Sequence, residues 1–415
     1  MSNQKTTNPA LETQQTPIRR YLEEFTLLTF AFYPWYGRLA DTITPSKSYW
    51  FDILYFVCVF AVIDYRHIRW EKVMRFAPFM LVYFWSSAIN GVPLLIFKET
   101  LRRVVGPFGI MLFASAVDWD YAKLRRLLIY ITISGLLMGG VAGYQVLTKQ
   151  APQSEWLDTE LDTDRTIIRV WSIFSIPTYY SIFVDISILV ALGLLLTSVG
   201  WIERFIWGLS FLGFLLAQLL TYARGGLLAS AFGLFVALAV ESLVWACVAA
   251  AAAVIGALTI PQLRDRLLTA FTWAYVQESS QPGGRIYQWG RALENVGILG
   301  GFKGIKQLLI GTGPGTFGTQ SSINLGLHGA LRIDSAYYAI MAEYGLLGVV
   351  SFVYFVVSTL LEGLKKVLNT EDKRVKLLLA CVLGAVSAWA FHGLTDNVFD
   401  YFYVLSWVFP LAMVL

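Results

Sequence analysis

The chain alternates between long apolar runs and short polar segments. Residues 1–21 are mostly polar, and from residue 22 onward apolar runs recur that are long enough to cross a bilayer as helices. The runs lie at 22–40, 49–64, 76–97, 104–117, 127–147, 178–199, 205–222, 227–260, 336–361, 377–393 and 398–415. The run 227–260 is too long for one span and holds Glu241 near its middle, so we expect two short spans that meet there. The pattern predicts about 12 transmembrane helices.

The chemistry of the backbone decides the fold class. In lipid, an open strand edge leaves backbone groups unpaired, whereas a helix pairs them internally. We therefore expect an all-α, polytopic membrane protein. Its expected parts are a cytoplasmic tail at 1–21, nine spans in 22–260, a large outer loop at 261–335 and three spans in 336–415. The loop is rich in Gly, Arg and aromatic residues and shows short helical patterns, which favours a functional loop over a disordered one.

Composition agrees with a membrane protein. Only 14% of the residues are charged and 56% are hydrophobic, whereas a soluble domain carries about 25% charged residues. With a mean hydropathy of +0.59, this excludes an ordinary soluble enzyme, a disordered protein and a nucleic-acid binder. Cys58, Cys247 and Cys381 all lie in apolar runs, so we interpret them as packing residues. They form neither a disulfide framework nor a zinc site.

The positions of the basic residues predict the orientation. With the N-terminus inside, the inner segments carry 16 of the 32 Lys and Arg residues, the short outer loops carry 9, and the long loop carries 7. Because basic residues accumulate on the cytoplasmic side, both termini are expected there. The first residues contain no apolar core or cleavage site, so we read them as a tail and not as a signal peptide. The net charge of +4 says little by itself.

Arg224 is the first candidate on the outer face. It lies between two apolar runs, in the segment Thr221–Gly226, and is followed by Gly225 and Gly226. One interpretation is an arginine at a helix end whose head reaches the interface. The other is an anion ligand at the mouth of an outer cavity, where the two glycines let the backbone approach a bound group.

A second candidate opens a helical pattern in the long loop. After Pro282-Gly283-Gly284-Arg285, an apolar stripe recurs at helical spacing (Ile286, Trp289, Leu293, Val296). We expect this helix to lie on the membrane surface. Free N–H groups at its start, beside Arg285, suit a phosphate. Arg291 lies about 120° further around the helix, so it is the reserve candidate for the same role.

The segment Gly311–Gly318 formally contains the glycine spacing G-x-G-x-x-G. A dinucleotide site would need a surrounding βαβ unit, and the helical pattern offers none. The glycines therefore predict a tight turn beside the site.

The end of the loop supplies candidates for acid–base chemistry. His328 lies next to the membrane near arginines, and it is either an incidental loop residue or a base. Asp334 stands where a helix begins, so it is either an N-cap or a carboxylate base kept ionised by arginines.

Three further acids and one histidine remain open at this stage. Asp396 and Asp400 bracket the last outer turn after His392, and they are either helix-end caps or cavity lining. Asp185 lies inside a span, where a carboxylate is a functional candidate by default, unless a neighbour such as Ser181 or Tyr180 satisfies it.

Four segments together resemble the O-antigen polymerase and O-antigen ligase superfamily of bacterial envelopes. They are the stretch Tyr222–Ala229, the pattern Gly284-Arg285-x-x-x-Trp289, the segment Gly311–Gly318, and the stretch Asp334–Gly348. They follow the family order over the large loop and its flanking spans, and the N-terminal half is similar only in hydropathy.

The last motif departs from the ligases. In ligases it reads His, then Asn, Ser or Gln, nine residues, then Gly. Ser335 and Gly345 keep that spacing, but Asp334 stands where the histidine is expected. Asp334 or His328 could do that histidine's work of activating the acceptor hydroxyl. The departure favours a polymerase over a ligase.

The resemblance implies a GT-C-like glycosyltransferase of the bacterial inner membrane. The implied reaction moves glycan from undecaprenyl diphosphate to a lipid-linked acceptor (polymerase) or to lipid A core (ligase), with inversion and with no metal ion or other cofactor. Our interpretation of Arg224 and Arg285 as anion ligands fits this reaction, because they supply fixed positive charge for a leaving diphosphate. Membrane lipid and other envelope glycan assembly proteins are the further partners expected. The alternative from another class is a transporter or flippase, and a structural membrane scaffold is the third.

Overall fold

The computed structural model describes residues 17–43, 60, 63, 65–150, 169–174, 176–269, 272–282, 284–317, 322, 325–327, 333–399 and 402–415. Over these ranges the long regular segments are all α-helices, and none of the residues lies in a strand. The all-α fold class predicted from the apolar runs is thus confirmed for the described part of the chain.

The helices fall into a bundle and a connecting arch. The bundle contains α1 (Pro17–Ile43), α3 (Trp70–Val73), α4 (Ala77–Ile89), α5 (Leu94–Ala116), α6 (Tyr121–Leu147), α8 (Pro177–Thr197), α9 (Trp201–Thr221), α10 (Arg224–Ala239), α11 (Leu243–Thr259), α17 (Ala336–Asn369), α18 (Lys373–His392) and α19 (Phe402–Val414). The arch contains α12 (Pro261–Thr269), α13 (Trp273–Ser279), α14 (Arg285–Asn295) and α15 (Ile305–Ile310). The large loop therefore carries the short helices that its sequence pattern predicts.

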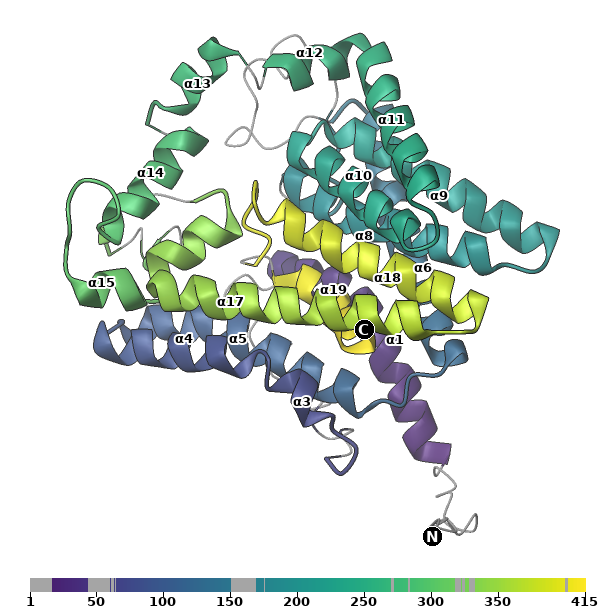
Figure 1. Cartoon of the computed structure of the whole chain (residues 1–415), viewed down its shortest axis with the longest axis horizontal. Helices are drawn as coiled ribbons and strands as arrows, with labels where there is room; N and C mark the ends of the chain where they lie inside the picture. The colour runs from purple at the N-terminus through teal and green to yellow at the C-terminus, as the bar shows by residue number, and fades with distance from the viewer. Residues whose placement is uncertain are drawn as a thin grey trace.

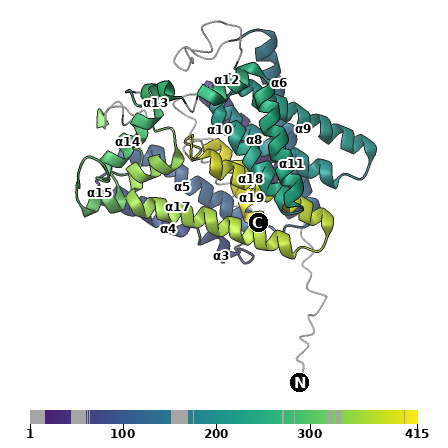
Figure 2. The ribbon, with the colours of Figure 1, turned by 45° about the horizontal axis from the view of Figure 1, so that its top comes forward.

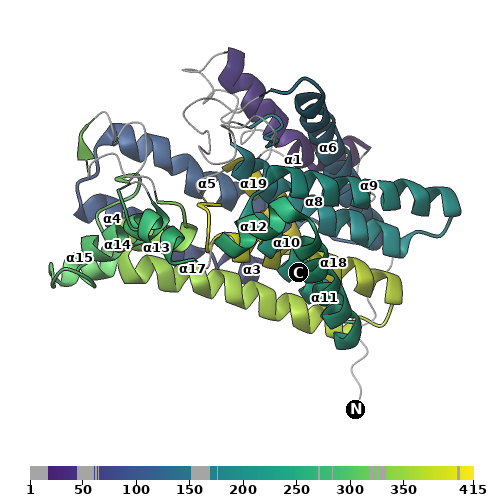
Figure 3. The same cartoon turned by 90° about the horizontal axis from the view of Figure 1, so that it is seen from above.

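Helix α8 lies at the centre of the bundle. Almost all of its residues are buried, and it packs against α6, α9, α10 and α18. The long helix α17 runs beside α4 and α18, while α9 projects at the opposite end of the molecule from α15 (Figures 1 and 3). Along another edge, α12 to α15 follow one another from α11 round to the start of α17 (Figure 2). The arch thus joins two parts of the bundle at one end.

The bundle has the properties of a helical membrane protein. Five helices are long and apolar enough to cross a bilayer: α6, α8, α9, α17 and α18. Shorter apolar helices accompany them, among them α4 and α10. The outward face of α9 exposes large apolar side chains, including Phe205, Leu209 and Leu212, which suits contact with lipid. The expected span 49–64 lies almost entirely outside the described residues.

The boundaries of the apolar runs are partly right. The chain does divide around Glu241, since α10 ends at Ala239 and Ser242 caps the start of α11 through the backbone N–H of Trp245. A carboxylate and a serine at that point favour a turn and an N-cap over a continued helix.

One pair of expected spans, 76–97 and 104–117, is wrong. The run 76–97 is not one helix, because the helix Ala77–Ile89 ends within it and the helix Leu94–Ala116 begins within it. The second of these helices also contains residues 98–103, the charged stretch that was expected in a loop. Gly91 has φ +59, which the helix cannot continue through. Hydropathy does not register that break, because both sides of it are apolar.

Segments that the predicted topology puts on the same side do meet. At one end Lys376 pairs with Glu241 at 3.8 Å, and the ammonium of Lys72 donates to the carbonyl of Met413 at 3.2 Å. At the other end the N–H of Ala336 donates to the carbonyl of Gly393 at 2.9 Å. The candidate site lies at this second end.

Candidate functional site

Arg285 meets two carboxylates from segments far away in the sequence. It is the first residue of α14, directly after Gly284, its N-cap. Its Nη2 lies 3.4 Å from Oδ1 of Asp396, which follows α18, and its Nε lies 3.9 Å from Oδ2 of Asp334, which precedes α17. A Cβ at Gly284 would lie 2.3 Å from the carbonyl oxygen of Ser279. The glycine is needed there for α13 to approach the start of α14.

Electrostatics keeps this group charged. Burial by itself would lower the pKa of the Arg285 guanidinium, but Asp396 and Asp334 raise it above its ordinary value. Burial would likewise raise the pKa of the Asp396 carboxyl, but Arg285 and His392 outweigh it and hold that pKa below its usual range. The Asp396 side chain is only 7% exposed, whereas Arg285 is 29% and Asp334 37% exposed. Arg285 and Asp334 can therefore be reached from outside.

Asp334 is not the N-cap of α17. Ser335 has that role, because its hydroxyl accepts the N–H of Tyr338 at 3.5 Å. The backbone of Asp334 is held from α14, since its N–H donates to Oε1 of Gln288 at 2.8 Å and its carbonyl accepts from Nε1 of Trp289 at 3.4 Å. These bonds fix the Asp334 backbone, while its carboxylate faces Arg285. The alternative of a capping role is therefore wrong.

The stripe of α14 faces the protein and not a membrane surface. The ring of Trp289 stacks on Tyr338 with centroids 5.1 Å apart and planes 10° apart. Ala292 and Val296 are fully buried, and α14 packs along the first part of α17. The expected amphipathic helix exists, but its apolar face covers α17, which leaves only Ile286 of the stripe exposed.

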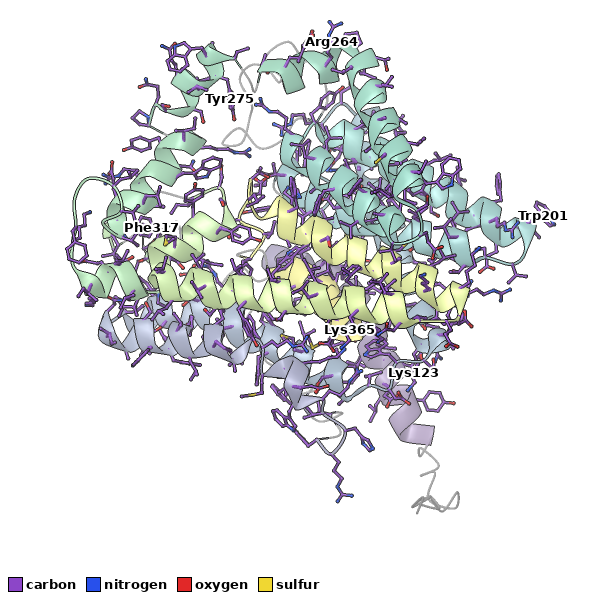
Figure 4. The ribbon with its side chains drawn as sticks, in the orientation of Figure 1. Lys123, Trp201, Arg264, Tyr275, Phe317 and Lys365 are labelled. Atoms are coloured by element: carbon purple, nitrogen blue, oxygen red, sulfur yellow. The ribbon has the colours of Figure 1, made fainter. Side chains whose placement is uncertain are left out.

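Arg224 reaches the same end of the bundle through α10. Tyr222, with φ +50, ends α9, and Arg224 begins the next helix. Its guanidinium lies over the ring of Tyr275 of α13, 4.7 Å from the centroid. Tyr275, labelled in Figure 4, is also among the groups that raise the pKa of Arg285. The tyrosine therefore lies near both arginines, and no sequence pattern pointed to it beyond its being an aromatic residue in the loop.

The glycines after Arg224 have a different partner from the one expected. A Cβ at Gly225 would lie 2.1 Å from Oγ1 of Thr395, and one at Gly226 would lie 1.7 Å from Oγ of Ser181. The close approach that they permit is thus to protein groups. They bring the start of α10 against α8 and against the turn that holds Asp396.

Behind Asp396 a set of polar side chains is fully buried. His392 places Nε2 3.2 Å from Oδ2 of Asp396 and Nδ1 2.6 Å from Oδ2 of Asp185. The other oxygen of Asp185 accepts from the hydroxyl of Ser230 and, at 3.1 Å, from Nε2 of Gln218. Asp185 is thus satisfied by groups from α9, α10 and α18.

Two neighbours considered from the sequence do not serve Asp185. The hydroxyl of Ser181 bonds Gln218 at 2.8 Å, and the hydroxyl of Tyr180 has no hydrogen-bond partner within the described part of the chain.

Asp396 is neither a simple helix cap nor open lining. The spacing of His392 and Asp396, four residues apart on one helix end, was the available signal for their contact.

The glycine-rich turn docks on a break in α17. Gly345 has φ +65 inside that helix, so the carbonyls before it lose their helical partners. The N–H groups of Thr312 and Gly313 donate to the carbonyls of Ala342 and Glu343 at 3.1 and 2.9 Å. A tight turn at this place is confirmed. The spacing from Ser335 to Gly345 has a structural explanation, because Ser335 caps the start of α17 and Gly345 breaks the helix.

The remaining candidates lie elsewhere. Arg291 pairs with Glu294 at 2.7 Å on the exposed side of α14, so its guanidinium is not brought to the acids around Arg285. His328 and Asp400 lie outside the described residues. Within the described ranges, no group of three or more His, Cys, Asp or Glu side chains is placed to hold a metal ion.

Compared with known protein families, the chain matches no family model. It also matches no curated protein.

Proposed function

We propose that the chain polymerises lipid-linked glycan repeat units at the periplasmic face of the bacterial inner membrane. In this proposal it is a GT-C-like glycosyltransferase with about 12 spans and both termini in the cytoplasm. The observation that carries the proposal is the convergence on Arg285. Two carboxylates, Asp334 and Asp396, come from segments that follow other helices and meet that one guanidinium at the end of the bundle.

Arg285 and Arg224 bind the diphosphate of the donor. The two ion pairs of Arg285, at 3.4 and 3.9 Å, are longer than the usual charge-assisted hydrogen bond of about 2.8 Å. A diphosphate oxygen can therefore form a shorter bond with the same guanidinium. Arg224, stacked on Tyr275, supplies a second fixed positive charge. Positive charge there stabilises the leaving group without a metal ion.

The reaction is a single displacement with inversion. The acceptor hydroxyl oxygen forms a bond to the anomeric carbon of the donor while the bond from that carbon to the phosphate oxygen breaks. The electron pair leaves with undecaprenyl diphosphate, and the hydroxyl proton passes to the carboxylate of Asp334. Asp334 suits this role because it is 37% exposed beside Arg285 and its backbone is held by α14.

The rival functions have weaker support. A ligase would transfer the glycan to lipid A core, and the aspartate at position 334 departs from the ligase histidine. A transporter would use Asp185 within a solute path, but its oxygens already accept from Ser230, Gln218 and His392. An acid enclosed in this way is suited to structure or positioning.

Gene disruption and complementation test the proposal. Disruption should leave surface glycan with single repeats, and the wild-type chain should restore the ladder. In the disrupted strain, the Arg285→Ala protein should be inserted but should fail to restore the ladder, whereas the Arg264→Ala protein should restore it fully. Arg264 is a matched control because it is an exposed arginine in the same loop, paired with Asp265.

Each other outcome selects a rival. Free lipid-linked polymer after disruption indicates a ligase, and unchanged glycan with altered solute uptake indicates a transporter. A normal ladder from Arg285→Ala contradicts the diphosphate role.

A further inference from the structure

A line of charged side chains runs from Arg285 into the centre of the bundle. Arg285 Nη2 lies 3.4 Å from Asp396, Asp396 lies 3.2 Å from Nε2 of His392, and Nδ1 of His392 lies 2.6 Å from Asp185. The contacts shorten toward the interior. The reaction described above uses Arg285, and neither His392 nor Asp185 touches the substrate in it.

The geometry of His392 favours a positive charge on its ring. Both ring nitrogens face carboxylate oxygens, and a neutral imidazole can donate from only one of them. Only the imidazolium donates to both Asp185 and Asp396. Its ring is fully buried, and a buried charge persists only where it is paired. Asp185, itself held by Ser230 and Gln218, supplies that pairing.

Asp396 is therefore shared between two cations. Oδ2 faces His392 and Oδ1 faces Arg285. A carboxylate with a single cation beside it would draw that cation into a short bidentate pair. The observed 3.4 Å to Arg285 is long for such a pair, as expected if His392 takes up part of the charge of Asp396.

We propose that His392, anchored by Asp185, is a positioning residue that keeps Asp396 from pairing fully with Arg285, so that the guanidinium stays available to the diphosphate. The choice of ligand rests on the proposed function, whereas the effect on Arg285 does not. His392→Gln removes the charge, so Asp396 closes on Arg285. The anion then binds less well, and the guanidinium reacts more slowly.

Labelling of Arg285 tests this without any ligand. The purified full chain in detergent is treated with phenylglyoxal, and modification of Arg285 is followed by peptide mass spectrometry. Arg291, on the same helix, serves as the internal reference. His392→Gln should slow the labelling of Arg285 roughly tenfold, as expected for a tightened charge pair. An unchanged rate overturns the proposal, and so does a faster one, which would indicate a loosened fold.

Asp396→Asn provides an independent variant if the first does not fold. It should speed the labelling of Arg285, because one of the two carboxylates is gone, and no change would overturn the proposal. In the Asp396→Asn background, adding His392→Gln should have no further effect, because His392 acts through Asp396. A further slowing in that background contradicts the proposal.

Ser187→Ala is the matched structural control. Ser187 is buried on α8 two residues from Asp185, and among the described residues its hydroxyl bonds only to its own helix, at the carbonyl of Phe183. It should leave the labelling rate unchanged, and a change as large as that of His392→Gln overturns the proposal.

Calorimetric titration with inorganic pyrophosphate connects the effect to the ligand. The wild type should bind it, and His392→Gln should raise the Kd roughly tenfold. An unchanged Kd overturns the positioning role. If the wild type does not bind pyrophosphate, the proposed diphosphate site fails instead, and the labelling result still decides the role of His392.

Discussion

At the scale of single residues, the importance of Arg285 lies in its partners. An arginine at a helix start is common, but this one is held between acids that follow α18 and precede α17. A planar guanidinium offers several donors in fixed directions, so it can hold both acids and still present an edge to an anion. A lysine at this position would offer one compact charge and would lose that geometry.

The proposed role of Asp334 as the base can be tested directly. If the chain is the proposed polymerase, Asp334→Asn should lower the rate of polymerisation in purified membranes by about 100-fold or more, the usual contribution of a positioned base. Asp334→His should keep part of the rate, since a histidine occupies this place in the ligase pattern. Full activity in Asp334→Asn would mean that the carboxylate is not the base.

The lowered pKa of a second residue, Lys72, predicts how the stability of the fold depends on pH. Lys72 is almost fully buried at the opposite end of the bundle, with Glu362 at 3.8 Å. Burial and Arg69 lower the pKa of Lys72 from 10.5 to about 8. Between these two values the unfolded chain binds a proton that the folded chain does not, so stability should rise as the pH rises through that window.

Lys72→Met isolates this effect. The variant should be more stable than the wild type below pH 8, by about 3 kcal/mol at most, and the difference should fade toward pH 10.5, the unfolded value. Thermal unfolding in detergent across that range measures it. A constant difference between the two proteins would contradict the lowered pKa of Lys72.

The residues of the site differ in how far the sequence could predict them. Arg224, Arg285 and Asp334 stand at helix starts beside glycine or serine, which local patterns reveal. The buried contact between His392 and Asp185 joins positions 207 residues apart, and no local pattern encodes it. Tyr275 was missed for the same reason.

At the scale of the elements, the break in α17 supports the site. Gly345 and Gly311 both have φ +65 and lie against each other's backbone segments. The turn bonds to carbonyls that the break releases, so the first part of α17, with Asp334 before it, is held in place by the arch.

Gly345→Ala should therefore be costly. A Cβ there would lie 2.5 Å from the carbonyl carbon of Leu309, and the positive φ adds strain, so we expect a loss of about 2–4 kcal/mol together with loss of activity. Gly140→Ala is the control, since nothing lies near its Cβ. Melting in detergent measures both, and equal effects would mean that the break is not important for stability.

Hydropathy predicts helices better than their ends. It located the division at Glu241 because a charge interrupts the run. It missed the break at Gly91, where the backbone turns between two apolar segments. It also assigned the face of α14 to a membrane surface, because amphipathicity shows that a face is covered and not what covers it.

At the scale of the whole molecule, the prediction concerns which end of the bundle faces which side of the membrane. The polar segments gather at two ends of the bundle, one with Glu241 and Lys376 and the other with Arg285 and Asp396. The basic residues of the first end predict that it faces the cytoplasm.

Single cysteines test that orientation. In a chain without its three natural cysteines, Phe302→Cys in the loop should react with a membrane-impermeant maleimide in spheroplasts. Trp201→Cys, at the exposed start of α9 (Figure 4), should react only after lysis. The reverse pattern would invert the predicted topology and contradict the proposed periplasmic position of the site.

The distance along the chain between Asp185 and His392 also limits when their contact can form during synthesis. A ribosome completes α8 long before it reaches α18, so the acid enters the membrane without its strongest partner. An unpaired ionised acid at a helix centre costs about 3 kcal/mol on insertion. Gln218 and Ser230, on the next two helices of the bundle to be synthesised, are the first groups that can bond to it. The set of bonds around Asp185 can therefore be complete only after α18 has been made.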